Sequence, residues 1–190
     1  MKFIDLFTLK HSKLAYRIDM ILYVAASMAL AAFLIIAAPP RQWVVIVVCV
    51  LIGLLSWTLI EYLLHRFVLH GLQPFSTWHA LHHRHPAELI CTPTLLSLTL
   101  IGVLVFLPVL MLGGWWRAWA LTLGVLSGYL AYSITHHAIH HWRANNTWSK
   151  RRKYLHALHH NAASHPGYYG VTSPFWDCVF GTNHHPGSGD

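Results

Sequence analysis

Charged side chains are scarce in this sequence. Of its 190 residues only 10% are charged, well below the ~25% typical of soluble domains, and 55% are hydrophobic. This composition excludes an ordinary soluble domain and favours a protein embedded in a membrane. Acidic residues are the fewest, with 6 Asp and Glu against 13 Lys and Arg, which gives a net charge of +7. Membrane topology explains this basic excess better than nucleic acid does, so we expect no nucleic-acid partner.

Cysteine is scarce as well, and the pattern of cysteines excludes two kinds of chemistry. Cys49, Cys91 and Cys178 lie far apart and form no metal-binding or redox motif. We therefore expect three unpaired, small, apolar side chains. The sequence also contains no His-Glu-x-x-His motif, which argues against a zinc hydrolase of that type.

Long apolar runs are the opposite of scarce, and they predict the fold class. Each is close to the ~20 residues that a helix needs to cross the hydrocarbon core of a membrane. Pro39 and Pro40 end the first run, Gly113 and Gly114 form the turn after the third, and Pro108 predicts a kink within the third. The sequence thus predicts an all-α integral membrane protein with four transmembrane helices, over residues 20–38, 44–60, 94–112 and 118–135.

The ends of the chain differ from this apolar body. Residues 1–19 combine large apolar side chains with lysine and arginine, which predicts an N-terminal segment in the membrane interface. No cleavable signal peptide is recognisable, so the first apolar run is expected to be an anchor. Residues 183–190 are rich in glycine and proline and predict a flexible tail. The expected organisation is one membrane-embedded domain over residues 1–190.

Histidine is unusually frequent, with 17 residues, most of them in four clusters. The repeated spacing is His-x-x-His-His, and on a helix the positions i, i+3 and i+4 share one face. Each such cluster is expected to direct three imidazoles into one small volume. Imidazole is the commonest protein ligand for transition metals, so the sequence predicts a polynuclear metal site. The clusters lie at residues 65–70, 79–83, 136–141 and 156–160.

The first cluster leaves two questions open. His65 and His70 are five residues apart, about 140° on a regular helix. They therefore either bind different metals or require the helix to unwind before Gly71. Glu61 lies one turn before His65, where a carboxylate could orient the imidazole ring or pair with Arg66. The helix of the second cluster is expected to begin with Ser76 or Thr77 as its N-cap and to end at 85–86.

Basic residues predict the orientation of the chain. The histidine clusters follow the second and fourth apolar runs, so they and both termini are expected on the same side of the membrane. Only Arg41 and Arg117 fall on the opposite side. The positive-inside rule makes the histidine side cytoplasmic, with the metal site and both termini in the cytoplasm. The basic residues on that side are Lys2, Lys10, Lys13, Arg17, Arg66, Arg84, Arg143, Lys150, Arg151, Arg152 and Lys153.

These motifs together resemble a known family. The sequence is similar to the fatty acid hydroxylase/sterol desaturase superfamily, and most similar to its fatty acid 2-hydroxylase branch. The resemblance runs from the second apolar run to Thr182, and it implies a non-haem di-iron oxygenase of four membrane helices with a cytosolic, histidine-rich helical cap. The motifs that carry it are Glu-Tyr-Leu-Leu-His-Arg-Phe-Val-Leu-His at 61–70, His-Ala-Leu-His-His at 79–83 and again at 156–160, His-His-Ala-Ile-His-His at 136–141, and Gly-Val-Thr-Ser-Pro-Phe-Trp-Asp at 170–177.

The resemblance also implies the ligands, about five for each of two metals. His137 and His141 repeat the spacing of His136 and His140 on a face rotated by ~100°. The motif favours 136 and 140 as ligands and leaves 137 and 141, with Glu61, as outer positions. Two iron ions are expected, with zinc as a possible substitute. The implied ligands are His65, His70, His79, His82, His83, His136, His140, His156, His159 and His160.

The activity implied is an O2-dependent monooxygenase that hydroxylates a lipid acyl chain, of a fatty acid or sphingolipid type, at the cytosolic membrane face. Residues 1–190 hold no cytochrome b5 domain, so electrons are expected from a separate reductase, ferredoxin or cytochrome. A carotenoid or sterol hydroxylase or desaturase of the same superfamily is the alternative. A histidine-rich metal transporter or haem protein is more remote, because transporters place their ligands at mid-membrane.

Overall fold

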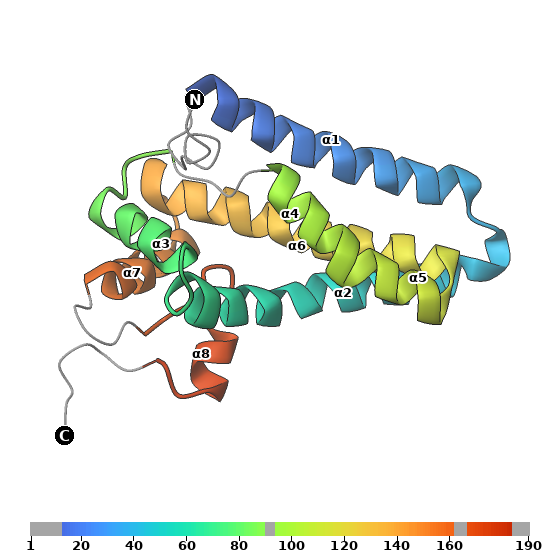
Figure 1. The fold of residues 1–190 in the computed structure, drawn as a ribbon. Helices are drawn as coiled ribbons and strands as arrows, with labels where there is room; N and C mark the ends of the chain where they lie inside the picture. The colour runs from blue at the N-terminus through green and yellow to red at the C-terminus, as the bar shows by residue number, and fades with distance from the viewer. Residues whose placement is uncertain (1–12, 90–93, 162–166, 184–190) are drawn as a thin grey trace. The chain divides into compact units, whose positions relative to one another are not determined.

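A computed structural model describes residues 13–89, 94–161 and 167–183 of the chain, and all regular structure among them is helical (Figure 1). The remainder of the expected N-terminal segment, residues 1–12, and almost all of the expected tail, residues 184–190, lie outside the described residues. The elements in chain order are α1 (Lys13–Ala37), the 3-10 turn η2 (Pro40–Gln42), α2 (Trp43–Leu63), the π-helical turn η3 (Leu64–Leu69), α3 (Phe75–Arg84), α4 (Thr94–Ile101), the π-helical turn η4 (Gly102–Phe106), α5 (Leu107–Gly113), α6 (Trp115–His141), α7 (Thr147–Asn161) and α8 (Phe175–Val179).

Four helical segments are long and apolar enough to cross a membrane, which confirms the predicted fold class. They comprise residues Lys13–Ala37, Pro40–Leu69, Leu96–Gly113 and Trp115–His141. Their outward faces are strongly apolar, as in Ile36, which is 84% exposed. The first helix starts earlier than the apolar run suggests, so residues 13–19 of the expected interfacial segment belong to α1.

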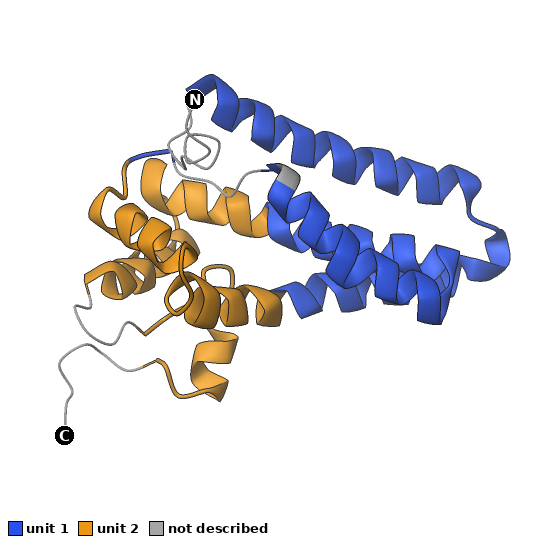
Figure 2. Cartoon of the chain, in the orientation of Figure 1, with its two compact units in different colours: residues 1–57, 88–130 blue, residues 58–87, 131–190 orange. Residues whose placement is uncertain are grey.

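The helices form two compact units, coloured separately in Figure 2. Unit 1 comprises residues 1–57 and 88–130, and unit 2 comprises residues 58–87 and 131–190. Helices α2 and α6 run from one unit into the other along the chain. All ten histidines implied as ligands belong to unit 2.

Glycine allows α2 and α6 to approach closely within unit 1. A Cβ atom at Gly124 would lie 2.2 Å from the backbone oxygen of Val50, and one at Gly53 would lie 2.4 Å from the oxygen of Leu121. Small residues at such crossings let two backbones pack directly, which is a common way to hold membrane helices together. Helix α2, which leads into the turn with the first histidine cluster, is therefore fixed by backbone contact to α6, which carries the third.

This contact predicts a selective effect of one added methyl group. Gly124→Ala should lower the thermal unfolding midpoint in detergent, because overpacking a tight contact costs about 1–3 kcal/mol. The matched control is Gly102→Ala, since a Cβ atom there would meet no heavy atom within 4 Å. Equal midpoints for the two variants would contradict the close packing.

The structure of the third span differs from the prediction in one respect. Pro108 is the second residue of α5, and the turn before it is the π-helical η4 instead of a simple kink. Proline has no N–H for the carbonyl four residues earlier and its ring crowds that carbonyl, so a wider turn accommodates it. The predicted turn at the end of this span is confirmed, because Gly114 follows α5 with a φ of 83°.

Candidate metal centre

Helix α3 supplies three of the clustered histidines of unit 2. It begins at Phe75 with Pro74 as its N-cap and no side-chain capping bond, so the expected cap at Ser76 or Thr77 is wrong. The N–H of Ser76 instead donates to the carbonyl oxygen of Leu72 over 2.8 Å, so the preceding turn satisfies a first-turn N–H group that a polar cap would otherwise serve. The helix ends at Arg84, as the His-Pro pair at 85–86 predicts.

The first cluster lies on η3, and its geometry answers one open question. The N–H of His70 donates to the carbonyl oxygen of His65, 3.2 Å away, which is the i→i+5 bond of a π-helix. In this wider turn residues five apart lie about one turn apart. Both imidazoles therefore face the same way, and the helix neither unwinds nor sends them to different sites.

Five imidazoles converge at the end of η3 and form what we call the five-histidine group. Their ligand atoms all lie within 4.8 Å of one another. The Nε2 atoms of His65 and His79 are 2.9 Å apart, those of His79 and His83 are 3.0 Å apart, and those of His70 and His159 are 3.1 Å apart. The members are His65, His70, His79, His83 and His159.

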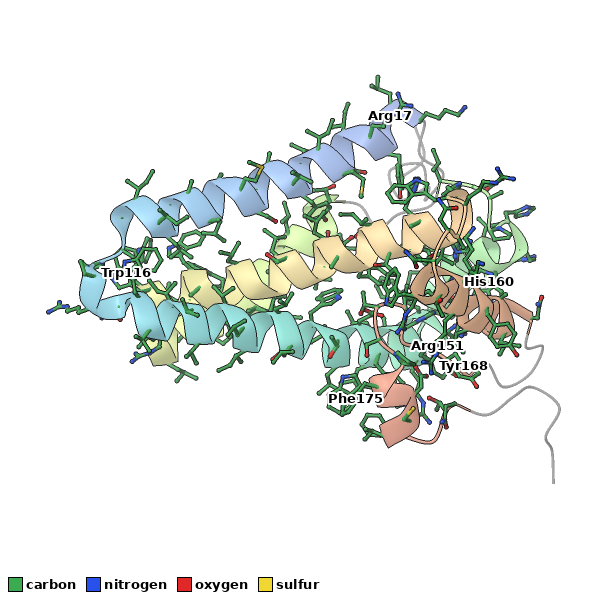
Figure 3. The ribbon with its side chains drawn as sticks, turned by 180° about the vertical axis from the view of Figure 1, so that it is seen from behind. Arg17, Trp116, Arg151, His160, Tyr168 and Phe175 are labelled. Atoms are coloured by element: carbon green, nitrogen blue, oxygen red, sulfur yellow. The ribbon has the colours of Figure 1, made fainter. Side chains whose placement is uncertain are left out.

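In a second set, which we call the four-histidine group, the ligand atoms also lie within 4.8 Å of one another. The Nε2 atom of His140 lies 3.2 Å from that of His136 and 2.9 Å from that of His156. His160, labelled in Figure 3, borders this set, with its Nε2 atom 3.0 Å from that of His156. Its ring also stacks on His83, with centroids 4.1 Å apart. The members of the group are His82, His136, His140 and His156.

The His-x-x-His-His clusters divide between the two groups, which corrects the expectation that each aims at one volume. In α3 the i, i+4 pair His79 and His83 joins the five-histidine group, whereas His82 joins the other. In α7 the i, i+4 pair His156 and His160 lies together, whereas His159 crosses to the five-histidine group. The reason is that positions i+3 and i+4 are ~100° apart on a helix.

The donor chemistry of these rings fits a cation. The Nδ1 atoms of His65 and His159 lie 2.6 Å and 2.7 Å from the carbonyl oxygens of Tyr169 and Gly167. A carbonyl only accepts, so each Nδ1 carries the hydrogen and each Nε2 presents a lone pair to its neighbours. Both ring nitrogens of His82 are buried and have no hydrogen-bond partner among the described residues. Converging lone pairs and orphaned nitrogens are what metal ligation satisfies.

Residues 167–172 position histidines of the five-histidine group, a role that the sequence did not indicate. Two of their carbonyls orient histidines of this group, and a buried carboxylate holds the segment in place. Asp177, which is fully buried, accepts the N–H groups of Tyr169 and Gly170 at 2.7 Å and 2.9 Å. The segment requires glycine at position 170, because a Cβ atom there would lie 2.0 Å from the backbone oxygen of Ser173.

Glu61 also holds this segment in place. Its Oε1 atom accepts the N–H groups of Val171 at 2.6 Å and Thr172 at 2.9 Å. The ring of His65 is instead oriented by a backbone carbonyl. Through this segment Glu61 therefore acts on the carbonyl that orients His65. His137 and His141 face each other on α6, with ring centroids 4.6 Å apart and outside both groups.

Burial lowers the pKa values of these histidines. It brings the pKa of His70 to about 4, that of His82 to about 3 and that of His160 to about 2, with repulsion from neighbouring imidazoles adding to the effect. For His79 and His159 the pKa is also lowered, and burial is again the largest cause. Neutral rings are thus favoured in the fold, and neutral imidazole is the form that ligates metals.

These shifts predict how the metal-free protein responds to acid. Below pH ~6.5 the unfolded chain binds protons on its histidines while the folded chain does not. The unfolding midpoint should therefore be constant above about pH 7 and fall as the pH drops from about 6.5 towards about 4. His82→Gln should give a shallower fall. A midpoint independent of pH in this window would contradict the burial of neutral rings.

The geometry defines a class: a helical membrane protein with two adjoining groups of buried or half-buried imidazoles able to hold metal ions. Residues 50–182 match the fatty acid hydroxylase family. The chain is 38% identical to the dihydroceramide fatty acyl 2-hydroxylase FAH2 of Arabidopsis thaliana over 68% of its own length and 58% of that protein. It is 33% identical to the ceramide very long chain fatty acid hydroxylase scs7 of Schizosaccharomyces pombe, over 70% of this chain and 41% of that protein. The chain belongs to the fatty acid hydroxylase family.

A solved structure agrees with this assignment. The structure described as full-length scs7p, with only its hydroxylase domain visible, is 27% identical and superposes with a TM-score of 0.78. The match covers 96% of this chain and 71% of that one. Together with the four apolar helices, these relatives make the chain an integral membrane protein. The chain spans less than two thirds of the length of the curated relatives it matches.

Proposed function

We propose that the two histidine groups hold one metal ion each. The observation that carries this is the convergence of nine imidazoles into two sets whose ligand atoms lie within 4.8 Å. We assign His160 as the fifth ligand of the second site, because it repeats the role that His83 has in the first. The first site then comprises His65, His70, His79, His83 and His159, and the second comprises His82, His136, His140, His156 and His160.

Iron is the metal we propose, and zinc is a substitute that the same imidazoles accept. Bound there, two iron ions would supply the reductive activation of O2 that an unactivated C–H bond requires. The chain itself provides neutral ligands, a buried setting that excludes water, and backbone carbonyls that fix His65 and His159. His137, His141 and Glu61 are proposed as outer positions that support the ligands.

The substrate we propose is a lipid acyl chain of a fatty acid or sphingolipid type, as the names of the relatives suggest. One oxygen atom of O2 enters a C–H bond as hydroxyl, and the other leaves as water with two electrons and two protons. A separate electron-donor protein is proposed as the source of the electrons. Residues 1–190 would act as one hydroxylase domain with both termini and the metal site in the cytoplasm, supported by the distribution of lysine and arginine.

Product analysis tests this proposal. Cells that lack acyl hydroxylation of their own should, on expressing the chain, accumulate hydroxylated acyl lipids that carry label from isotopic O2. The matched control is the variant His82→Ala, expressed at the same level, which should produce none. Unchanged acyl lipids with well-folded, metal-loaded protein would contradict the proposal, and hydroxylated sterols or carotenoids in their place would redirect it to the other branch of the superfamily.

A further inference from the structure

Helix α8 presents an apolar surface that the metal site does not use. Phe175 and Val179 of α8, and Phe180 directly after it, are 58%, 54% and 47% exposed. Between residues 170 and 183 the one charged side chain is Asp177, which is fully buried. An element with large exposed apolar side chains and no exposed charge is unsuited to water.

The contacts of α8 fix its place beside the second span. The indole N–H of Trp176 donates to the hydroxyl oxygen of Thr58 over 3.0 Å, and the ring of Phe180 stacks on Tyr62 with centroids 5.2 Å apart. Figures 1 and 3 show α8 alongside the C-terminal half of α2, with Phe175 labelled in the latter. All of these residues belong to unit 2, so this placement lies within a single compact unit.

The position of Thr58 along α2 gives the depth of α8. Thr58 follows Trp43, the first residue of α2, by about 22 Å along the helix axis at 1.5 Å per residue. The hydrocarbon core of a bilayer is about 30 Å thick. Thr58 lies within the candidate membrane span Pro40–Leu69, and Trp176, which donates to it, lies at the same level. The side chains of Leu63, Leu64 and Phe67 on the same span are exposed as well.

Several backbone N–H groups of α8 are satisfied within the protein. A bilayer offers no water to unpaired N–H groups, so these must be satisfied within the protein. The N–H of Phe175 donates to the side chain of Ser173, and the N–H groups of Cys178 and Phe180 donate to carbonyls of Pro174 and Trp176. Asp177, the one charged group, is enclosed by its own donors.

We propose that α8 is a membrane-inserted element, immersed in the leaflet that surrounds the C-terminal half of α2, with Phe175, Val179 and Phe180 among the acyl chains. The occupant of this surface is the lipid bilayer, because α8 packs against residues of a candidate membrane span and its own exposed side chains are apolar. Asp177, on the opposite side of α8, holds the segment that orients His65 and His159. The same short helix would thus contact the bilayer on one side and, through Asp177, hold the segment 167–172 that positions histidines of the five-histidine group.

Spin labels measure the immersion directly. The full-length chain, with Cys49, Cys91 and Cys178 replaced by serine, would carry a nitroxide label at Val179→Cys or, as the control, at Tyr154→Cys on the polar helix α7. In liposomes the label at 179 should collide more with O2 than with a water-soluble nickel chelate, and the label at 154 should show the reverse. A label at 179 that behaves like the one at 154 would overturn the proposal. Low collision rates with both reagents would also overturn it, because they would show that protein covers α8.

The natural chain offers a second measurement that needs no substitution. Cys178 is exposed on α8. A thiol reacts with maleimide as its thiolate, which hydrocarbon disfavours, so in liposomes a lipid-soluble carbene photolabel should modify the peptide that contains Cys178, whereas a charged maleimide supplied on both sides of the membrane should not. Equal modification by the two reagents, located by peptide mass spectrometry, would count against immersion. Immersion depends on α2 being a membrane span and not on hydroxylase activity, so failure of this proposal leaves the proposed function unaffected.

Discussion

Replacement of His140 by alanine is expected to abolish turnover and to release about half of the bound metal. The Nε2 atom of His140 lies within 3.2 Å of two other Nε2 atoms of the four-histidine group, so no neighbouring ring can replace it. His137→Ala is the matched control, since the two residues share a helix and a side chain type. The ring of His137 faces His141 instead, and its loss should keep both metal ions.

The effect of the control should be smaller but measurable. Loss of a residue that supports a ligand typically costs ~10–100-fold in metal affinity or activity, so His137→Ala should retain some turnover. Full metal content and turnover in His140→Ala, with loss of both in His137→Ala, would mean that the other face of α6 binds the metal. Metal content and turnover of the two purified variants decide between these outcomes.

Asp177→Asn is expected to lower metal affinity by ~10–100-fold, although Asp177 touches no histidine of either group. One carboxylate oxygen accepts the N–H of Tyr169 and the other accepts that of Gly170. An amide would place its own NH2 group against one of these donors, and a buried unsatisfied donor costs ~1–3 kcal/mol. The segment would shift, and with it the carbonyls that orient His65 and His159.

A control separates this positioning role from a loss of folding. Thr182→Val removes a hydroxyl that donates to the same carboxylate over 2.8 Å but leaves both backbone contacts of Asp177 intact. It should therefore lower the unfolding midpoint without a comparable change in metal affinity. The affinity is measured by competition with a chelator on the folded protein. Unchanged affinity in Asp177→Asn would show that the segment does not position the ligands.

Much of the fold could be predicted because membrane spans follow from local composition. Four apolar runs gave four helices, and the Gly-Gly pair gave the turn at Gly114. The boundaries were less accurate, since α1 extends back to Lys13 through residues that alternate in character. The π-turn at η4 was missed, because proline indicates a disturbance in a helix without determining its form.

The sequence predicted which histidines form the candidate site, but not how they divide between the two groups. Repeated imidazoles at helical spacing predict that they converge, and nine of the ten implied ligands lie in the two groups. Regular α-helical geometry misplaced His65 and His70, since sequence gave no indication of the π-turn between them. The assignment of His82 to the four-histidine group and of His159 to the five-histidine group depends on how α3 and α7 pack. The carbonyls of Gly167 and Tyr169 left no signal, because every residue has a backbone carbonyl.

The count of metal ions per folded chain tests the central claim, two metal sites built from ten histidines. The protein would be purified in detergent, loaded with ferrous iron without oxygen, freed of excess metal and measured by elemental analysis against its amino-acid content. We predict about two metal ions per chain, and about one in His140→Ala. One metal ion or fewer in fully loaded, folded wild-type protein would contradict the account.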